Sequence, residues 1–396
     1  MSEASLRIGG VEADLLAEIY DTPVYVYDAD VIRSRYRALV AAIEYPRTRV
    51  CYSCKANGNP EILRLMLEIG ADGIDAVSLG EVHLALGVGF PADRISITNP
   101  GLSVEDLETI RELGIHLKAD SISQLRRWRR LGAGPVSLRI NPGAGFGHHE
   151  HVVTGGPNSK FGIYLHELDE ARRLAGDVVG LHQHAGCGAL DPDTFIQTAE
   201  PLFRVAFGFA ELEELNLGGG LGVPYRPGER PLDLDVLGRK LSRRFETFCR
   251  EYGRNLALAL EPGRYIVAES GFLLSRVQAV KDSGSRRFAI VDTGFNHLLR
   301  PILYDAYHAV VNVSNGGGPP ERIWVGGNVC ESGDLLTGER EVAAVREGDL
   351  LAILNVGAYG YAMSSDYTGA ARPAEVMVDG GWHRPIRARS GPPVAS

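Results

Sequence analysis

The chain has 396 residues, of which 44% are hydrophobic and 23% are charged, an ordinary balance for a soluble globular protein. This length predicts two or three domains, and the net charge of −9 disfavours a nucleic-acid partner. No apolar run approaches the length of a membrane span. Residues 1–10 lack the apolar core of a signal peptide, and the five cysteines do not form a disulfide pattern. We therefore expect no membrane association and a cytoplasmic location.

Eight short apolar runs, each bounded by Gly, Pro, Asn or Asp, predict strands that are buried on both faces. Stretches with helical spacing lie between them, such as Pro60–Ile69 and Leu234–Tyr252. This alternation predicts an α/β fold with parallel strands, a (β/α)8 TIM-like barrel over residues 30–270. The predicted strands are Val50–Ala56, Ala71–Val77, Arg94–Asn99, Ile115–Ala119, Val136–Asn141, Val178–Ala185, Leu212–Leu217 and Leu256–Leu260.

After Gly271 the pattern changes to alternating or β-branched runs, joined by turns such as Asp379-Gly380-Gly381. These runs predict a second, all-β domain of the sandwich or barrel type. We expect residues 271–396 to form it together with residues 1–29, in which Val24–Tyr27 is a further strand. The other predicted strands are Phe272–Lys281, Phe288–Asp292, Ile323–Val325, Leu350–Leu354 and Ala374–Val378.

Residues suited to catalysis stand at the ends of four predicted barrel strands: Lys55, His184, the run Gly218-Gly219-Gly220, and Glu261. The carboxyl ends of barrel strands meet at one rim, which carries the active site in this fold. The glycine run could bind a phosphate through its backbone N–H groups, or it could be a flexible turn. A lysine, an anion-binding loop and a carboxylate that face one another indicate pyridoxal phosphate chemistry.

Each of these side chains also has a structural interpretation. Lys55 could be a desolvated, nucleophilic amine, or it could extend from the rim into solvent. Glu261 could hold a proton on the ring nitrogen of a cofactor, or it could pair with Arg264. His184 could stack on the cofactor ring or pack as an ordinary polar residue. His182 lies two residues earlier on the same strand face, and we expect it to have a packing role.

Two motifs raise the question of a metal site. Cys51 and Cys54 form a CxxC pair, but their position within a strand and the lack of a second pair favour buried core cysteines. His148, His149 and His151 lie close together without a further group at ligand spacing. We therefore expect no metal.

Taken together, the motifs resemble the fold-type III PLP-dependent decarboxylases, which include the diaminopimelate, ornithine and arginine decarboxylases. The resemblance extends from about Tyr25 to Gly380, and EPGR, RPxLY, CESGD and GAY together look most like the diaminopimelate decarboxylases. The matching blocks are YSCKAN, DAVSLGE, TGGPNSKFG, HAGCG, NLGGGLG, EPGRYIVAESG, VDTGFNHLLRPILYDAYH, CESGD and GAYGYAMSSDY.

The resemblance implies a cofactor, pyridoxal 5′-phosphate (PLP), and a role for each motif residue. Lys55 would carry the cofactor, with Asp75 and Glu81 beside it, while His184 would stack on its ring and Glu261 would pair with the ring nitrogen. The remaining cofactor-binding residues would be Gly218, Gly219, Gly220, Gly263, Arg264 and Tyr359.

The resemblance also implies a homodimer with shared active sites. Cys330 and Glu331 would reach the pocket from the other subunit, with Cys330 as the proton donor. The substrate would be bound by Arg264, Arg300, Tyr304, Glu331 and Tyr359.

The charges near the implied substrate site indicate its specificity. Glu331, Arg264 and Arg300 would together suit a substrate end that bears both an ammonium and a carboxylate. Meso-diaminopimelate has such an end, and its decarboxylation to L-lysine and CO2 is the expected reaction, as in lysine biosynthesis. Cys187 stands where this family usually has Ser. The alternative is a related decarboxylase that acts on another amino acid, or on a carrier-bound aminoacyl substrate, in a specialised pathway.

Two other classes of function stay open. A non-catalytic relative that binds partners would not need intact Lys55, Glu261 and Cys330, all of which are present. An amino-acid racemase would need a second acid–base group on the opposite ring face, whereas the Cys330-Glu331 block is typical of decarboxylases.

Overall fold

The computed structural model describes residues 6–132, 134–143, 145–147, 149 and 154–391. It contains two compact units: residues 36–224 with 230–265, and residues 1–35 with 225–229 and 266–396. Helix α2 (Ala29–Ala42) runs across the first boundary between them. The domain limits that the sequence predicts, at residues 30 and 270, are not tested by this division into compact units and stay predictions.

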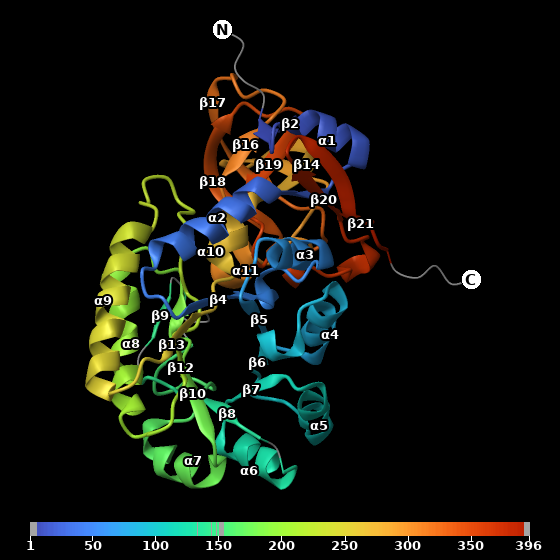
Figure 1. The fold of residues 1–396 in the computed structure, drawn as a ribbon. Coiled ribbons are helices and arrows are strands. Elements are labelled where there is room, and N and C mark those ends of the chain that lie inside the picture. The colour runs from blue at the N-terminus through green and yellow to red at the C-terminus, as the bar shows by residue number, and fades with distance from the viewer. Residues whose placement is uncertain (1–5, 133, 144, 148, 150–153, 392–396) are drawn as a thin grey trace. The chain divides into compact units, whose positions relative to one another are not determined.

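The unit of residues 36–224 and 230–265 contains a closed barrel of parallel strands, which confirms the expected fold class. The strands follow one another around the ring in chain order, and the last closes onto the first where Leu260 pairs with Val50. All eight predicted barrel strands are present in the described chain, and Figure 1 shows helices α6 to α9 outside the ring. The strands are β4 (Thr48–Ser53), β5 (Gly73–Ala76), β6 (Ile95–Ile97), β7 (His116–Ala119), β8 (Val136–Arg139), β10 (Val178–His182), β12 (Glu214–Asn216) and β13 (Ala257–Leu260).

The barrel helices begin and end at the expected signals. In α9 (Leu234–Tyr252), Asp233 accepts a hydrogen bond from the backbone N–H of Val236, and the chain leaves the helix through Gly253 with φ of 84°. A positive φ of this kind costs glycine little. The other helices of this unit are α3 (Pro60–Glu68), α4 (Leu79–Val88), α5 (Val104–Leu113), α6 (Ile122–Arg130), α7 (Leu168–Ala175) and α8 (Pro192–Ala206).

Several strands are shorter at their carboxyl ends than the apolar runs predict, and this difference places the rim residues. The first strand was expected to extend to Ala56, but β4 ends at Ser53, and Cys54–Ala56 form the short 3-10 helix η1. The backbone N–H of Ser53 donates to the carbonyl of Pro262 across the rim, at 3.3 Å. Lys55 is therefore part of a turn over the rim. Likewise, β10 ends at His182, so that His184 lies beyond the strand.

Short segments complete the unit between these elements. They include a two-residue parallel strand pair near the rim, in which Gly186 pairs with Phe146 and Cys187 pairs with Gly147. These segments are β9 (Phe146–Gly147), β11 (Gly186–Cys187), η2 (Ala92–Arg94) and η4 (Leu165–Glu167).

The other unit is built on a mixed sheet, as the change of period after Gly271 predicts. The early strand β3 (Val24–Asp28) pairs with β14 (Gly271–Ser283) and β20 (Ala374–Asp379), so the N-terminal segment joins this sheet as expected. The further strands are β15 (Arg286–Val291), β16 (Val310–Asn312), β17 (Pro320–Gly326), β18 (Leu335–Ala343), β19 (Leu350–Leu354) and β21 (Trp382–Arg387). A separate pair consists of β1 (Arg7–Ile8) and β2 (Val11–Glu12). The helices are α1 (Ala13–Tyr20) and α11 (Arg300–Tyr304), with the 3-10 segments η5 (Ala268–Ser270), η6 (Tyr361–Met363) and η7 (Tyr367–Gly369), and α10 (Arg264–Val267) runs across the boundary between the units at residues 265 and 266.

The core of this sheet unit consists of aliphatic side chains. Val24 and Val26 of β3 pack with Leu274 of β14 and with Leu16 of α1. Over the part of the chain that the structure describes, no helix is both long and apolar enough to cross a bilayer.

Candidate active site

Lys55 and Asp75 face each other at the carboxyl end of the barrel. Lys55 Nζ lies 3.9 Å from Asp75 Oδ2. The lysine side chain is 35% exposed, whereas the aspartate is 3% exposed and also accepts a hydrogen bond from Ser53 Oγ at 2.9 Å. The amine is thus accessible from the rim and stays close to a buried negative charge.

Glu261 is the centre of a buried polar network. Its Oε1 atom accepts a hydrogen bond from Asn216 Nδ2 at 2.7 Å and contacts Lys118 Nζ, and its Oε2 atom lies 3.1 Å from His182 Nε2. Lys118 Nζ also lies 3.0 Å from Asp75 Oδ1. Residues more than two hundred positions apart in the chain therefore form one chain of contacts.

Electrostatics keep Glu261 charged. Burial alone would raise the pKa of its carboxyl group, but the charge of Lys118 and the hydrogen bonds from His182 and Lys118 hold that pKa well below its ordinary value. His182, in contrast, is kept uncharged. Burial lowers the pKa of His182, so its imidazole is neutral near neutral pH. His182 is buried inside the barrel as expected, and its ring is in addition a hydrogen-bond partner of Glu261.

His184 is held against the glycine loop. Its Nδ1 atom accepts a hydrogen bond from the backbone N–H of Gly219 at 3.3 Å, and its carbonyl accepts one from Thr154 Oγ1 at 2.6 Å. Burial, followed by the charge of Lys55, lowers the pKa of His184 well below its ordinary value. The ring is therefore neutral, and its orientation is fixed from the Nδ1 side.

The glycine run packs tightly against the neighbouring strand ends. A Cβ on Gly218 would collide with the carbonyl of Gln183, and one on Gly219 would collide with the carbonyl of Glu261. The backbone N–H of Gly218 donates to Asn216 Oδ1 at 2.8 Å. Glycine is required here by close backbone contacts, independently of any anion that the loop binds.

The EPGR segment lies beside the lysine turn. A Cβ on Gly263 would lie 2.8 Å from Ala56 Cβ, so only glycine fits at this position. The guanidinium of Arg264 contacts Cys187, with Nε 3.3 Å and Nη2 3.2 Å from the sulfur. The alternative interpretation of Glu261 as the ion-pair partner of Arg264 is therefore wrong, since Glu261 binds Lys118 instead.

Glu81 is a further acidic group near the lysine. Its Oε2 atom accepts a hydrogen bond from the backbone N–H of Val77 at 2.7 Å. Burial, together with the negative charge of Asp75, raises the pKa of Glu81 to about 7. This carboxyl group can therefore exchange a proton near neutral pH.

The remaining predicted site residues belong to the sheet unit. Arg300 is 1% exposed, and its Nη1 atom lies 2.9 Å from His308 Nε2 while its guanidinium lies over the Tyr225 ring. Tyr304 is the last residue of α11. Tyr359 has a positive φ of 58°, a conformation that a non-glycine residue adopts at a cost.

Cys330 and Glu331 are exposed on a turn between β17 and β18. Asp334 organises this turn, because its carboxylate accepts the backbone N–H groups of Phe295 at 2.7 Å and Val329 at 2.8 Å. The turn therefore presents a free thiol and a carboxylate on a fixed backbone.

The metal-binding alternatives gain no support from the geometry. Cys51 and Cys54 are buried free thiols, as predicted. His148 and His151 lie outside the described residues. Among the described residues, no group of three or more His, Cys, Asp or Glu side chains could hold a metal ion.

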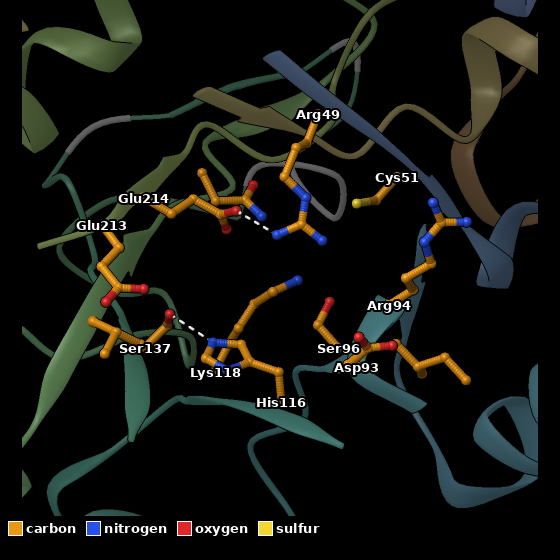
Figure 2. Close-up of a pocket in the computed structure, with 13 residues that line it drawn as sticks. Arg49, Cys51, Asp93, Arg94, Ser96, His116, Lys118, Ser137, Glu213 and Glu214 are labelled. Atoms are coloured by element: carbon orange, nitrogen blue, oxygen red, sulfur yellow. Dashed lines mark hydrogen bonds and ion pairs between the residues drawn. The ribbon is translucent and has the colours of Figure 1, made fainter. Parts of the chain in front are cut away.

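A cavity of about 180 Å³ lies at the opposite end of the barrel from Lys55. It is lined by residues at the amino ends of the strands, including Arg49, His116, Ser137 and Glu214. Figure 2 shows His116 and Lys118 reaching into the barrel from the same strand, with Arg49 bound to Glu214 across from them. In this fold the amino-end face serves stability and the carboxyl-end face serves chemistry, so the Lys55 rim is the candidate active site.

Sequence reasoning missed Lys118 and Asn216, which bind Glu261 directly. The signal for Lys118 was available, because a lysine within a buried strand requires a negative partner. Asn216 opens the NLGGGLG block but resembles an ordinary strand end.

The residues present suit a pyridoxal cofactor. An accessible amine on Lys55 could form the covalent link, and Glu261 offers a buried carboxylate that is held in its charged form. His184 presents a neutral ring with a fixed orientation beside the glycine loop. Amine, acid and aromatic ring all lie on the carboxyl side of the barrel strands.

Comparisons with known proteins agree with this geometry. Residues 29–268 match the family of the pyridoxal-dependent decarboxylase, pyridoxal binding domain. The diaminopimelate decarboxylase of Methanothermobacter thermautotrophicus is 44% identical, over 97% of this chain and 93% of its own length. The Escherichia coli K12 diaminopimelate decarboxylase is 37% identical, over 93% and 92%.

Solved structures give the same result for the whole fold. A diaminopimelate decarboxylase crystal structure matches with a TM-score of 0.88 and 35% identity, covering 98% of this chain and 96% of that one. The Helicobacter pylori diaminopimelate decarboxylase complexed with L-lysine matches with a TM-score of 0.87 and 32% identity, covering 95% and 96%. Because the likeness in sequence and fold covers nearly the entire chain, this protein belongs to the diaminopimelate decarboxylase family of pyridoxal-dependent decarboxylases.

Proposed function

We propose that this enzyme binds pyridoxal 5′-phosphate and decarboxylates meso-diaminopimelate to L-lysine and CO2. The convergence of Lys55, Asp75 and Glu261 in one contact network at the barrel rim is the observation that carries the proposal. Family membership over nearly the whole chain supports the same substrate class.

In this proposal, Lys55 holds the cofactor covalently and Asp75 keeps its amine in place. Bound pyridoxal 5′-phosphate supplies an electron sink for the pair that remains on Cα when the bond to the departing carboxylate breaks. Glu261 provides a fixed negative charge for a protonated ring nitrogen. His184 limits the tilt of the ring, because the Gly219 amide fixes its imidazole. We assign binding of the cofactor phosphate to the loops of Gly218–Gly220 and Gly263 and to Tyr359.

We assign substrate selection to charged side chains that can bind a substrate end bearing both an ammonium and a carboxylate. Arg300 is held by His308 and Tyr225, so its guanidinium is oriented before the substrate binds. Such pre-orientation reduces the entropy lost when a carboxylate binds. We assign Arg264, Arg300 and Tyr304 to the substrate carboxylate and Glu331 to the ammonium.

We also propose a homodimer in the cytoplasm. Cys330 and Glu331 are exposed within the single chain, which suits residues that complete a partner's site. After CO2 leaves, the electron pair on Cα takes up one proton, and we assign its delivery to the Cys330 thiol. The Asp334 turn would hold this donor in place, as general acid catalysis requires.

The decisive experiment measures CO2 release by purified enzyme loaded with pyridoxal 5′-phosphate. The substrates are meso-diaminopimelate, lysine, ornithine, arginine and glutamate. We expect turnover of meso-diaminopimelate alone, loss of turnover in Lys55→Ala, and wild-type turnover in Lys240→Ala, which removes a surface lysine paired with Asp193.

Other outcomes would redirect the assignment. Turnover of another amino acid without meso-diaminopimelate would retain the decarboxylase chemistry and overturn the substrate. Loss of optical rotation without CO2 release would instead identify a racemase.

A further inference from the structure

Lys118 is a lysine buried inside the barrel, on strand β7. Its side chain is 2% exposed, and its Nζ atom lies 3.0 Å from Asp75 Oδ1 and contacts Glu261 Oε1. A buried ammonium is costly unless negative groups compensate it. Asp75 and Glu261 compensate it here, and burial is outweighed by their charges, so the ammonium form persists.

Asp75 uses its two oxygens for different partners. Oδ1 contacts Lys118, while Oδ2 accepts the hydrogen bond from Ser53 and points toward Lys55. The contact with Lys118 therefore fixes which oxygen faces the catalytic amine.

The two carboxylate oxygens of Glu261 also have different partners. Oε1 contacts Lys118 and Asn216, while Oε2 faces His182. Lys118 is thus the one cation among the described side chains that bridges both carboxylates of the site.

Without that bridge, the two acids would be incompatible as neighbours. The side chains of Asp75 and Glu261 are 3% and 4% exposed, and both reach the same ammonium. Two buried carboxylates that are close enough to contact one ammonium repel each other when that ammonium is absent, so one of them takes up a proton. A protonated Glu261 would no longer offer a negative charge, and a protonated Asp75 would attract Lys55 less.

We propose that Lys118 is a positioning residue whose ammonium keeps Asp75 and Glu261 charged and oriented at the same time. One carboxylate is thereby directed at Lys55, and the other is preserved for the ring nitrogen of the cofactor. The second half of this inference rests on the proposed function, whereas the charge balance does not.

Further titratable groups surround this bridge from neighbouring strands. His182 interacts with Glu261; Cys51, His116 and Glu214 interact with Lys118, while Arg49 acts through its charge on these three groups and Arg139 through its charge on His182. The groups other than His182 are Cys51 and Arg49 on β4, His116 on β7, Arg139 on β8 and Glu214 on β12.

The first test uses protein without added cofactor. Lys118→Met keeps the length of the side chain but removes the charge, and Lys240→Met is the matched control at a surface Lys–Asp pair. Because one buried carboxyl of Lys118→Met should bind a proton that the unfolded chain releases, the variant should lose more stability at about pH 8 than at about pH 5.5. We therefore expect the melting temperature of Lys118→Met to fall further below that of the wild type at the higher pH than at the lower one. An equal deficit at both would overturn the proposal.

A double variant separates charge balance from packing. Lys118→Met combined with Asp75→Asn removes one charge of each sign, so the additional pH dependence should disappear. If Lys118→Met does not fold, the double variant still distinguishes the two roles. Recovery of folding in the double variant would support charge balance, whereas a failure of both would show that Lys118 is needed for packing alone.

The second test is titration with pyridoxal 5′-phosphate, followed by visible absorbance. We expect Lys118→Met to bind about tenfold more weakly or worse, as for the loss of one charged hydrogen bond, and Lys240→Met to bind as the wild type does. Unchanged affinity in Lys118→Met would overturn the role toward the cofactor. If the wild type itself did not bind, the proposed function would fail while the pH test of the charge balance would still stand.

Discussion

His182 Nε2 lies 3.1 Å from Glu261 Oε2, and both side chains are buried. His182 Nδ1 has no hydrogen-bond partner among the described residues. A bare Nδ1 is tolerable only as a lone pair, so the proton resides on Nε2 and is donated to Glu261. The imidazole is therefore a neutral donor that stabilises the carboxylate without cancelling its charge.

Glu261→Gln should destabilise the protein strongly. The change leaves the ammonium of Lys118 with Asp75 as its remaining partner, and breaking a buried ion pair costs about 3–5 kcal/mol. We expect a loss near the lower end of that range, measured by urea unfolding at neutral pH. Decarboxylation should fall as well, since the amide carries no charge.

The matched control for this change is Glu200→Gln. Glu200 forms a bidentate pair with Arg244 at the surface of the barrel helices, at 2.6 and 2.7 Å. This pair is half-buried and close to solvent, and ion pairs near the surface contribute only about 0–1 kcal/mol. Equal losses in the two variants would contradict the buried network around Glu261.

Acid should destabilise the sheet unit through His297. Burial lowers the pKa of His297 to about 4, and the charges of Arg389 and Arg372 contribute to the shift. The unfolded chain then binds a proton below about pH 6.5 that the folded chain does not. The contribution of neutral His297 to the free energy of unfolding is complete above that pH. It is lost as the pH falls toward 4, by about 1.4 kcal/mol per pH unit.

Urea unfolding between about pH 7 and pH 5 measures this slope. His297→Gln should make the slope shallower by about one proton. A slope that stays the same in His297→Gln would show that this side chain is already charged in the folded state.

The barrel strands could be predicted because each is a short apolar run closed by turn residues. Strands β18 and β21 were not predicted, since Glu339-Arg340-Glu341 and Arg384-Pro385 interrupt their apolar patterns. Their strand conformation depends on pairing with β17 and β20, which the local sequence does not encode.

The site was predictable as a set of rim residues, but its internal contacts were not. Lys118 approaches Glu261 only because the barrel closes and turns both side chains inward. A sequence separation of 143 positions gives no local hint of that distance. The lysine within the run His116–Ala119 was the one available sign.

Asp334→Ala should loosen the turn that carries Cys330 and Glu331. The change leaves the backbone N–H groups of Phe295 and Val329 without their acceptor, at a cost of about 2 kcal/mol or more. We expect a lower melting temperature and a lower kcat, with nearly unchanged binding of pyridoxal 5′-phosphate. Asp193→Ala, which removes a surface carboxylate paired with Lys240, should change neither the melting temperature nor kcat. Weaker cofactor binding would argue that the turn supports the cofactor rather than the proton donor.

Mixing two inactive variants tests whether the active site is shared between subunits. In the proposed dimer, Lys55 comes from one chain and Cys330 from the other. A mixed dimer of Lys55→Ala with Cys330→Ala would then contain one site with both native residues and one with neither. Random mixing gives about half mixed dimers, so CO2 release should recover to about one quarter of the wild-type rate after the subunits are exchanged.

The single variants define the background of this experiment. Each alone should lack most activity, because Lys55→Ala has no attachment point and Cys330→Ala has lost its proton donor, a change that costs about 10²–10⁴-fold. If both residues acted within the same chain, every site of the mixed dimer would still lack one of them, and no activity would return. Recovery therefore depends on the partner's contribution, since neither variant can repair its own chain.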